Sequence, residues 1–192
     1  MSRYDFLVET YRTERLKTLG VWAQIPIDRV AWRPEPRARS PLEHLVHQCL
    51  SEDTWMRTML GLEIERPALP DVETRDAFIQ HYGDCASARH AQLARQPDEW
   101  FEGETQFFDV RRTRAWVLTR RVTHTAHHRG QLTMYLRAWG LPLYSTYGPT
   151  ADTGGLPKNG AQVIYRGAEV SELLADGPRL PGTGEKPVTE RT

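Results

Sequence analysis

The first stretch of regular hydrophobic spacing lies near the start of the chain. Apolar side chains recur there every three or four residues, glutamate and arginine fill the other positions, and Arg15 interrupts the pattern. This period matches one face of an α-helix. The pattern therefore predicts an amphipathic helix whose buried face consists of Tyr4, Leu7, Val8, Tyr11, Leu19 and Trp22.

A second helix is predicted over residues 41–60, after a proline-containing connection over residues 25–38. Ser40 can accept hydrogen bonds from the first free amides, Pro41 suits the first helical position, and Glu43 completes a capping box. Gly61 follows as a C-terminal stop. The stripe that we expect to face the core is Leu42, Leu45, Val46, Cys49, Met56 and Leu60. Residues 61–72 are predicted to form a loop long enough to cross the end of a bundle, so the helices it joins need not be antiparallel.

Two further helices are predicted from caps and spacing. The third begins near Thr74, stops before Pro97 and buries a face made of Phe78, Tyr82, Cys85, Ala86, Arg89 and Leu93. Residues 98–108 are aromatic and show no clean period, so we expect irregular structure there. Asp109 is a candidate cap for the last long helix, which ends at Gly140 and carries Val117, Arg121, His124, His128, Leu132, Tyr135 and Trp139.

The composition shifts after Gly140 toward turn-forming residues. Residues 161–167 suggest a short strand and residues 168–177 a short helix, both in an extension packed on the helices. Residues 178–192 are rich in proline, glycine and charge, which predicts a flexible end. We therefore expect one domain over residues 1–148 and a C-terminal extension over residues 149–192, with about the last fifteen residues flexible.

Charge and cysteine content exclude several classes of function. Lysine and arginine number 25 against 25 acidic residues, with no basic run, so nucleic acid is not an expected partner. Cys49 and Cys85 lie far apart and form no CxxC motif, which favours a reducing compartment. The N-terminal residues lack the apolar core of a signal peptide, and no apolar run approaches the ~20 residues of a membrane span. We expect a soluble cytoplasmic protein that does not bind membranes.

Histidine spacing on the last helix is the main chemical signal. His124 and His128 are four residues apart, so their side chains lie on one helical face within reach of a single metal ion. They also interrupt an apolar stripe, where an imidazole is costly unless both ring nitrogens find partners. A metal on one nitrogen and an acceptor on the other would satisfy both. The alternative is a pair of histidines at the helix surface or at the edge of the core.

The other histidines differ in their position on the predicted helices. His127 lies about 100° from His128 and is expected to be solvated or to support the site from outside. On the second helix, His47 sits at the edge of the apolar stripe whereas His44 lies nearly opposite it, so His47 is the stronger ligand candidate and His44 stays an alternative. His81 and His90 are expected at the surface.

Charged side chains also interrupt the predicted apolar stripes, namely Arg121, Arg89 and Asp53. We favour mutual pairing of these groups over a role in binding a substrate anion. The tryptophans are expected to belong to the core and its rim.

Two segments together carry a family resemblance. HLVHQCLSEDTW, with His47, Glu52 and Trp55, and HTAHHRGQLTMYLRAWG resemble the two signature helices of the DinB/YfiT-like superfamily of metalloenzymes. The similarity extends over about residues 4–148 and includes the WRP of residues 32–34. It implies an all-α fold, a four-helix bundle with a long crossover between helices two and three, and frequently a homodimer.

The same resemblance implies a function. It places the three metal ligands on His47, His124 and His128, and it implies a divalent ion, usually zinc or nickel, with open coordination positions. Relatives of known activity are S-transferases that use bacillithiol, mycothiol or glutathione, together with related isomerases. We therefore expect a metal-dependent S-transferase that activates a low-molecular-weight thiol for attack on a small-molecule electrophile. His127, Arg129 and Gln131 are candidates for contacts to substrate or cofactor.

Two alternatives remain open at this stage. One is a hydrolase that uses the same three-histidine site with water as the nucleophile. The other is a non-enzymatic binding protein that the ion stabilises, or in which the histidines only pack. For the second alternative we expect a large loss of melting temperature when the metal is removed, with no turnover of any thiol or ester.

Overall fold

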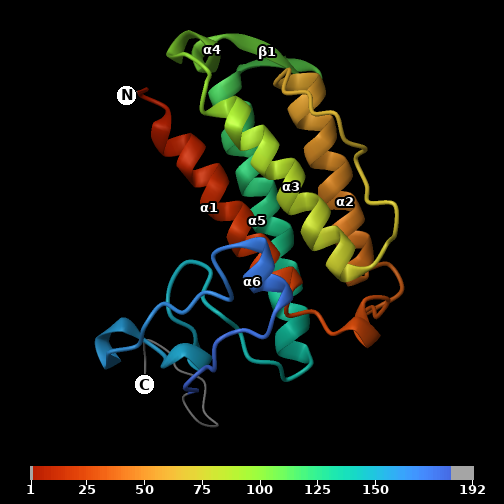
Figure 1. Ribbon diagram of the computed structural model, residues 1–192, viewed down its shortest axis with the longest axis vertical. Helices are drawn as coiled ribbons and strands as arrows, with labels where there is room; N and C mark the ends of the chain where they lie inside the picture. The colour runs from red at the N-terminus through yellow and green to blue at the C-terminus, as the bar shows by residue number, and fades with distance from the viewer. Residues whose placement is uncertain (1, 183–192) are drawn as a thin grey trace.

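The computed structural model describes residues 2–182, which are mostly helical (Figure 1). The helices α1 (Asp5–Trp22), α2 (Pro41–Thr54), α3 (Arg75–Leu93) and α5 (Arg114–Ala138) pack lengthwise, with α1 between α3 and α5 and with α2 in contact with both of these. α1 and α5 run in one direction and α2 and α3 in the other. The core between them includes Leu19, Trp22, Leu45, Met56, Phe78, Ile79, Val117 and Leu132.

The start of α2 confirms the predicted capping box. Ser40 accepts a hydrogen bond from the amide of Glu43, and the Glu43 carboxylate accepts one from the amide of Ser40. A short 3-10 turn, Ile27–Arg29, lies in the preceding connection. After Thr54 the helix continues as a π-helical turn, Trp55–Met59, and Gly61 ends it with a φ of 68°. The predicted length is therefore confirmed, but the last turn is wider than an α-helix.

The connection from α2 to α3 runs back along the side of the bundle (Figure 1). α3 consequently starts near the end of the molecule where α2 also starts, and the two helices are parallel neighbours. Thr74 caps α3 by accepting a hydrogen bond from the amide of Ala77, as predicted. The loop predicted over residues 61–72 is present, but it runs along the side of the helices and not across their end.

The segment between α3 and α5 corrects two predictions. Residues 98–108 are not irregular: they form the short helix α4 (Asp98–Glu102) and β1 (Glu104–Phe107), which pairs antiparallel with β2 (Val110–Thr113). Asp109 lies in the hairpin turn and does not cap α5, whose cap is Thr113, accepting from the amide of Trp116. Phe108, in the same turn, has a φ of 50°. α5 begins where β2 ends, and the end of β2 is set by its pairing with β1. The spacing of apolar residues within α5 does not reveal this pairing.

The extension packs on α1 and α3 through α6 (Val170–Leu174), which confirms the predicted short helix. Leu173 is 1% exposed there, and two 3-10 turns precede it, Ala151–Thr153 and Pro157–Asn159. The strand predicted over residues 161–167 is wrong. This segment is irregular and is held by Ile164, whose carbonyl accepts from the Ser145 amide and whose amide donates to the Ser145 hydroxyl.

The flexible end predicted over residues 178–192 is described only as far as Gly182. The carbonyl of Pro178 accepts a hydrogen bond from the Tyr144 hydroxyl, and the Gly182 amide donates to the carbonyl of Asp152. Residues 183–192 lie outside the described part of the chain, and the domain boundary at residue 148 stays a prediction. Residues 2–182 contain no helix that is both long and apolar enough to cross a membrane.

Candidate metal centre

Three imidazoles from two helices converge at one side of the bundle. His47 projects from α2, and His124 and His128 project from α5, with one ring nitrogen of each within 4.8 Å of the others. Nε2 of His124 and Nε2 of His128 are 3.2 Å apart. Two nitrogens on one tetrahedral zinc ion, each about 2.0–2.1 Å from it, lie roughly 3.3 Å apart. The donor set therefore fits a divalent ion after small side-chain adjustments.

Gln131 fixes the orientation of the His128 ring. Its side-chain oxygen lies 2.7 Å from Nδ1 of His128 and accepts the proton on that nitrogen. A neutral imidazole with its proton on Nδ1 has a free lone pair on Nε2, which is the atom facing His124. Gln131 thus prepares His128 to act as a ligand through Nε2.

His124 is held between an arginine and a tryptophan. Nη1 of Arg121 lies 3.2 Å from Nδ1 of His124, and the Trp55 ring stacks on the imidazole with centroids 5.5 Å apart. When Nδ1 accepts from Arg121, the proton of a neutral His124 sits on Nε2 and points toward His128. An ion on Nε2 of His124 would require the other neutral tautomer, with the proton on Nδ1, and the hydrogen bond from Arg121 would then be lost. The Arg121 guanidinium keeps the hydroxyls of Ser51 and Thr125 as other acceptors.

The surroundings keep these imidazoles neutral. Burial, followed by the positive charge of Arg39, lowers the pKa of His47 to about 4. Burial and then Arg121 lower the pKa of His124 to about 3, and burial also lowers the pKa of His128. Only the neutral ring has a lone pair for a metal, so the pocket favours the form that binds.

Metal-free protein should lose stability as the pH falls below about 6.5. The unfolded chain binds protons on these histidines near pH 6.5, whereas the folded chain binds them only near pH 4 at His47 and pH 3 at His124. The stability is therefore fully present above pH 6.5 and lost as the pH falls through the folded values. Thermal unfolding of EDTA-treated protein between pH 7 and pH 5 measures this slope.

His47→Gln and His124→Gln should each flatten that slope, and the exposed His127→Gln serves as a control for losing a histidine. An equal slope in all four proteins would contradict the assignment of this pH dependence to the half-buried imidazoles of His47 and His124.

The neighbouring histidines occupy different environments. His44 is 2% exposed, so the expectation that it lies opposite the buried stripe is wrong. Its ring packs 5.3 Å from that of His128 and 5.9 Å from that of Tyr135, but it is not part of the three-nitrogen group. His127 is exposed, in agreement with its predicted position, and its ring centroid lies 5.0 Å from that of His128.

A buried carboxylate connects the metal centre to the rest of the core. Glu52 is 1% exposed and accepts hydrogen bonds from the hydroxyls of Tyr11, at 2.7 Å, and Tyr82. Arg89 and Arg121 approach it with nitrogen–oxygen distances of 3.6 and 3.7 Å. We call these five residues the Glu52 cluster. Because Arg121 also contacts His124, the cluster positions a candidate ligand.

The predicted pairing is confirmed for Arg89 and Asp53, whereas Arg121 faces Glu52 and not Asp53. Arg89 also binds Asp53 at 2.9 Å, and Asp53 in turn binds Arg57 at 2.7 Å. In the sequence, Glu52 stands out only through the family resemblance. Its burial could have been predicted, because it falls at helical spacing between Cys49 and Met56 in the apolar stripe.

Arg129 lies away from the three histidines. Its guanidinium is buried against α1, where it donates to the Glu14 carbonyl and the Thr18 hydroxyl, both at 3.2 Å, and pairs with the Glu14 carboxylate. The Tyr147 hydroxyl completes this group. Among the residues predicted to contact substrate or cofactor, Gln131 therefore lies at the candidate metal centre and Arg129 lies outside it.

The histidines open onto a cavity of about 470 Å³ lined by Arg39, His47, Arg120, His124, His127 and His128. We call it the histidine pocket. Its volume lies within the range of small-molecule sites. Arg39 and Arg120 were not singled out from the sequence, although Arg120 lies one helical turn before His124. The pocket gives a small molecule direct access to the candidate ligands.

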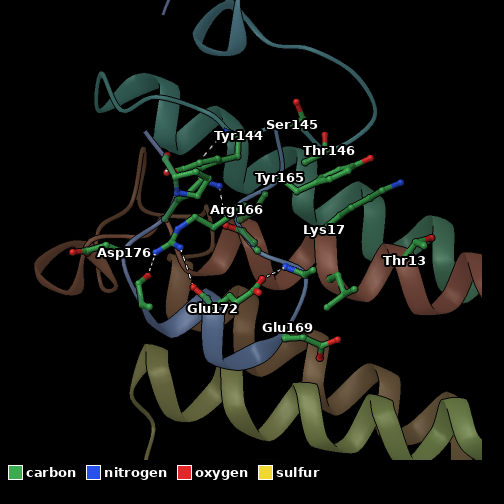
Figure 2. A pocket seen from close by; sticks show the side chains of 18 of the residues that line it. Thr13, Lys17, Tyr144, Ser145, Thr146, Tyr165, Arg166, Glu169, Glu172 and Asp176 are labelled. Carbon is green, nitrogen blue, oxygen red and sulfur yellow. Dashed lines mark hydrogen bonds between the residues drawn. The ribbon is translucent and has the colours of Figure 1, made fainter. Parts of the chain in front are cut away.

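A larger cavity of about 750 Å³ lies between α1 and the extension (Figure 2). Its basic side chains are engaged within the protein: Arg166 donates to the carbonyls of Glu172 and Ala175, and Lys17 binds Glu14 at 2.7 Å. No histidine lines this cavity. Size alone favours it, but within residues 2–182 the group of three side chains able to hold a metal lies at the smaller pocket.

Comparisons with known proteins identify the family and the fold of this chain. A family model described as the DinB family matches residues 1–156. A DinB-like protein of Bacillus cereus is 18% identical, with a TM-score of 0.63 over 73% of this chain and 95% of its own. A DinB-like protein of Bacillus subtilis is 19% identical, with a TM-score of 0.57 over 74% of this chain and 99% of its own. At these identities the two structures show a shared fold. A search of curated proteins gave no match.

Proposed function

We propose that this chain, which belongs to the DinB family, binds a divalent metal ion and uses it to activate a low-molecular-weight thiol for attack on a small electrophile. The proposed ligands are His47, His124 and His128. The observation that carries the proposal is the convergence of their three ring nitrogens, within 4.8 Å, on a pocket open to small molecules.

The donor set favours a catalytic role over a structural one. Structural zinc sites are usually closed by four protein ligands, often cysteines, whereas catalytic sites use three and leave a position open. No cysteine or carboxylate joins the three histidines in the described residues. An all-imidazole set suits zinc and nickel, which are the ions that we propose.

The chemistry follows from an open coordination position. A divalent ion held by His47, His124 and His128 would lower the pKa of a thiol, so that thiolate would be available near neutral pH. Gln131 keeps the proton of His128 on Nδ1, Trp55 holds the ring of His124, and the exposed His127 is placed to accept the thiol proton. The sulfur then bonds to the electrophilic carbon, and the leaving group departs with its electron pair.

A transfer assay tests this proposal directly. With N-acetylcysteine and 1-chloro-2,4-dinitrobenzene, zinc- or nickel-loaded protein should form the aryl thioether at least about tenfold faster than the metal-free protein, and His128→Ala should abolish the gain. Loss of chloride and formation of the thioether should occur in equal amounts.

The controls in this assay separate the alternative functions. Hydrolysis of 4-nitrophenyl acetate that needs the metal but no thiol would favour a hydrolase. A large fall in melting temperature on metal removal, without turnover in either assay, would favour an ion that only stabilises the fold. The homodimer implied by the family resemblance stays a prediction, and light scattering of the purified protein measures it.

A further inference from the structure

The histidine pocket is lined by basic side chains and contains no acidic one. Two arginines, Arg39 and Arg120, stand with the four histidines around the cavity. Arg39 belongs to the segment just before α2, and Arg120 lies on α5 one turn before His124. The two guanidinium groups therefore reach the cavity from different elements.

Neither arginine has a partner that neutralises it. Both are exposed, and within residues 2–182 their guanidinium groups form no hydrogen bond and no ion pair. This contrasts with Arg33, Arg89 and Arg121, which are all held by carboxylates. Unpaired arginines facing one small cavity are available to a ligand.

The sequence around the pocket supplies no carboxylate to compensate this charge. α5 contains no aspartate or glutamate from Arg114 to Ala138. Near Arg39, the carboxylate of Glu43 is engaged by Arg33 and by the Ser40 amide, which together lower its pKa to about 2. A divalent ion on the histidines adds two further positive charges. The field in the pocket therefore attracts anions and repels cations.

The arginines and the candidate ligands line the same cavity. Arg39 and Arg120 share its wall with His47, His124 and His128, and Arg120 lies four residues before His124 on α5. An anionic group bound between the arginines therefore leaves the rest of a small molecule facing the imidazoles.

We infer that the thiol which this pocket accepts carries an anionic group, a carboxylate or a phosphate, that binds Arg39 and Arg120 while its sulfur faces His47, His124 and His128. This inference rests on the proposed function. It makes the two arginines determinants of specificity, separate from the metal ligands, and it selects against thiols that carry an ammonium group.

Three thiols of nearly equal size test the charge preference on the cobalt-loaded full-length protein: 3-mercaptopropionate, 2-mercaptoethanol and cysteamine. Thiolate binding to cobalt gives a charge-transfer absorption from which each Kd is read. We expect 3-mercaptopropionate to bind about tenfold more tightly than cysteamine at low salt, with a smaller ratio at high salt. The ammonium group makes the cysteamine thiol more acidic than that of 3-mercaptopropionate. A larger fraction of thiolate would therefore favour cysteamine, so tighter binding of 3-mercaptopropionate cannot come from thiol acidity.

Matched variants assign the preference to the pocket. Arg39→Gln combined with Arg120→Gln should bring the two Kd values within about twofold when both proteins are compared at full cobalt loading. Arg37→Gln combined with Arg95→Gln removes the same charge from exposed positions outside the pocket and should keep the tenfold ratio. Equal affinities in the unaltered protein, or a preference that persists without Arg39 and Arg120, would overturn the inference.

A second measurement keeps the two proposals distinguishable. If none of the thiols reaches cobalt, the proposed function fails, and inorganic phosphate then tests the charge of the pocket. Phosphate added to metal-free protein should shift the ring-nitrogen NMR signals of His124 and His127 in the unaltered chain and not in the Arg39→Gln, Arg120→Gln protein. Identical shifts in both proteins, or none in either, would refute an anion-selective pocket.

Discussion

Replacing Glu52 by alanine should lower the free energy of unfolding by about 3–5 kcal/mol, the usual cost of removing one partner from a buried ionic group. The Glu52 side chain is 1% exposed and faces two arginines that are 2% and 0% exposed, Arg89 and Arg121. Its loss leaves Arg121 with an uncompensated charge in the core and leaves Arg89 with Asp53 as its only carboxylate partner. Chemical denaturation followed by circular dichroism measures the change.

The hydroxyls of Tyr11 and Tyr82 add to this cost, because both donate to the missing carboxylate. A buried donor without an acceptor is itself destabilising by about 1–3 kcal/mol. Glu52→Gln should cost less than Glu52→Ala, since the amide oxygen still accepts a hydrogen bond. The amide carries no charge, so Arg121 stays uncompensated in this variant.

Glu104→Ala is the matched control for this prediction. It removes a carboxylate that binds Arg111 at 3.0 Å, but both side chains are more than half exposed, and such pairs contribute at most about 1 kcal/mol. A similar small loss in the Glu52→Ala protein would contradict the view that this carboxylate organises the core.

The parts of the fold that were predictable are those that local chemistry decides. Ser40, Pro41 and Glu43 mark the start of α2 because a capping box needs only neighbouring residues. Thr74 marks the start of α3 for the same reason. Gly61, with a positive φ, ends the π-helical turn that continues α2. Each of these signals acts within a few residues and can be read without knowing the tertiary structure.

The errors arose where distant segments decide the structure. The hairpin that precedes α5 depends on pairing between β1 and β2 and on the hydrogen bond from Thr105 to the carbonyl of Met59, so Thr113 and not Asp109 caps the helix. Residues 161–167 have the composition of a strand but no partner strand in the described residues. Helical angle alone also misplaced His44, because packing against α5 buries it.

The candidate site shows the same division. The spacing of His124 and His128 brings their nitrogens together on one helix, which the sequence reveals. The distance to His47 depends on how α2 packs against α5, and only the family resemblance pointed to that residue in advance. Arg39 and Arg120 were missed because an exposed arginine has no signature in sequence until its cavity is known.

Loss of any one of the three histidines should weaken metal binding by at least about 100-fold. Removing a group that only orients a ligand typically costs 10–100-fold in metal affinity, and removing a ligand costs more. We therefore expect a graded loss of metal affinity. It should be largest in His47→Ala, His124→Ala and His128→Ala, about tenfold in Gln131→Leu, and close to zero in His127→Ala. Competition with a chromophoric chelator at pH 7.5 measures the metal affinities of these five variants and of the unaltered protein.

Gln131→Leu is the informative member of this series. It leaves all three imidazoles in place but removes the acceptor that keeps the proton of His128 on Nδ1. Metal binding as strong as in the unaltered protein would contradict the orienting role of this hydrogen bond without affecting the ligand assignment.

Elemental analysis of the purified protein tests the three-histidine centre most directly. The unaltered chain and the His127→Ala protein should each carry about one zinc or nickel ion per chain, while His47→Ala, His124→Ala and His128→Ala should each carry less than a tenth of that amount, with all five proteins folded by circular dichroism. Stoichiometric metal in any one of the three ligand variants, or none in the unaltered protein after growth with both metals, would contradict the metal centre proposed for these helices.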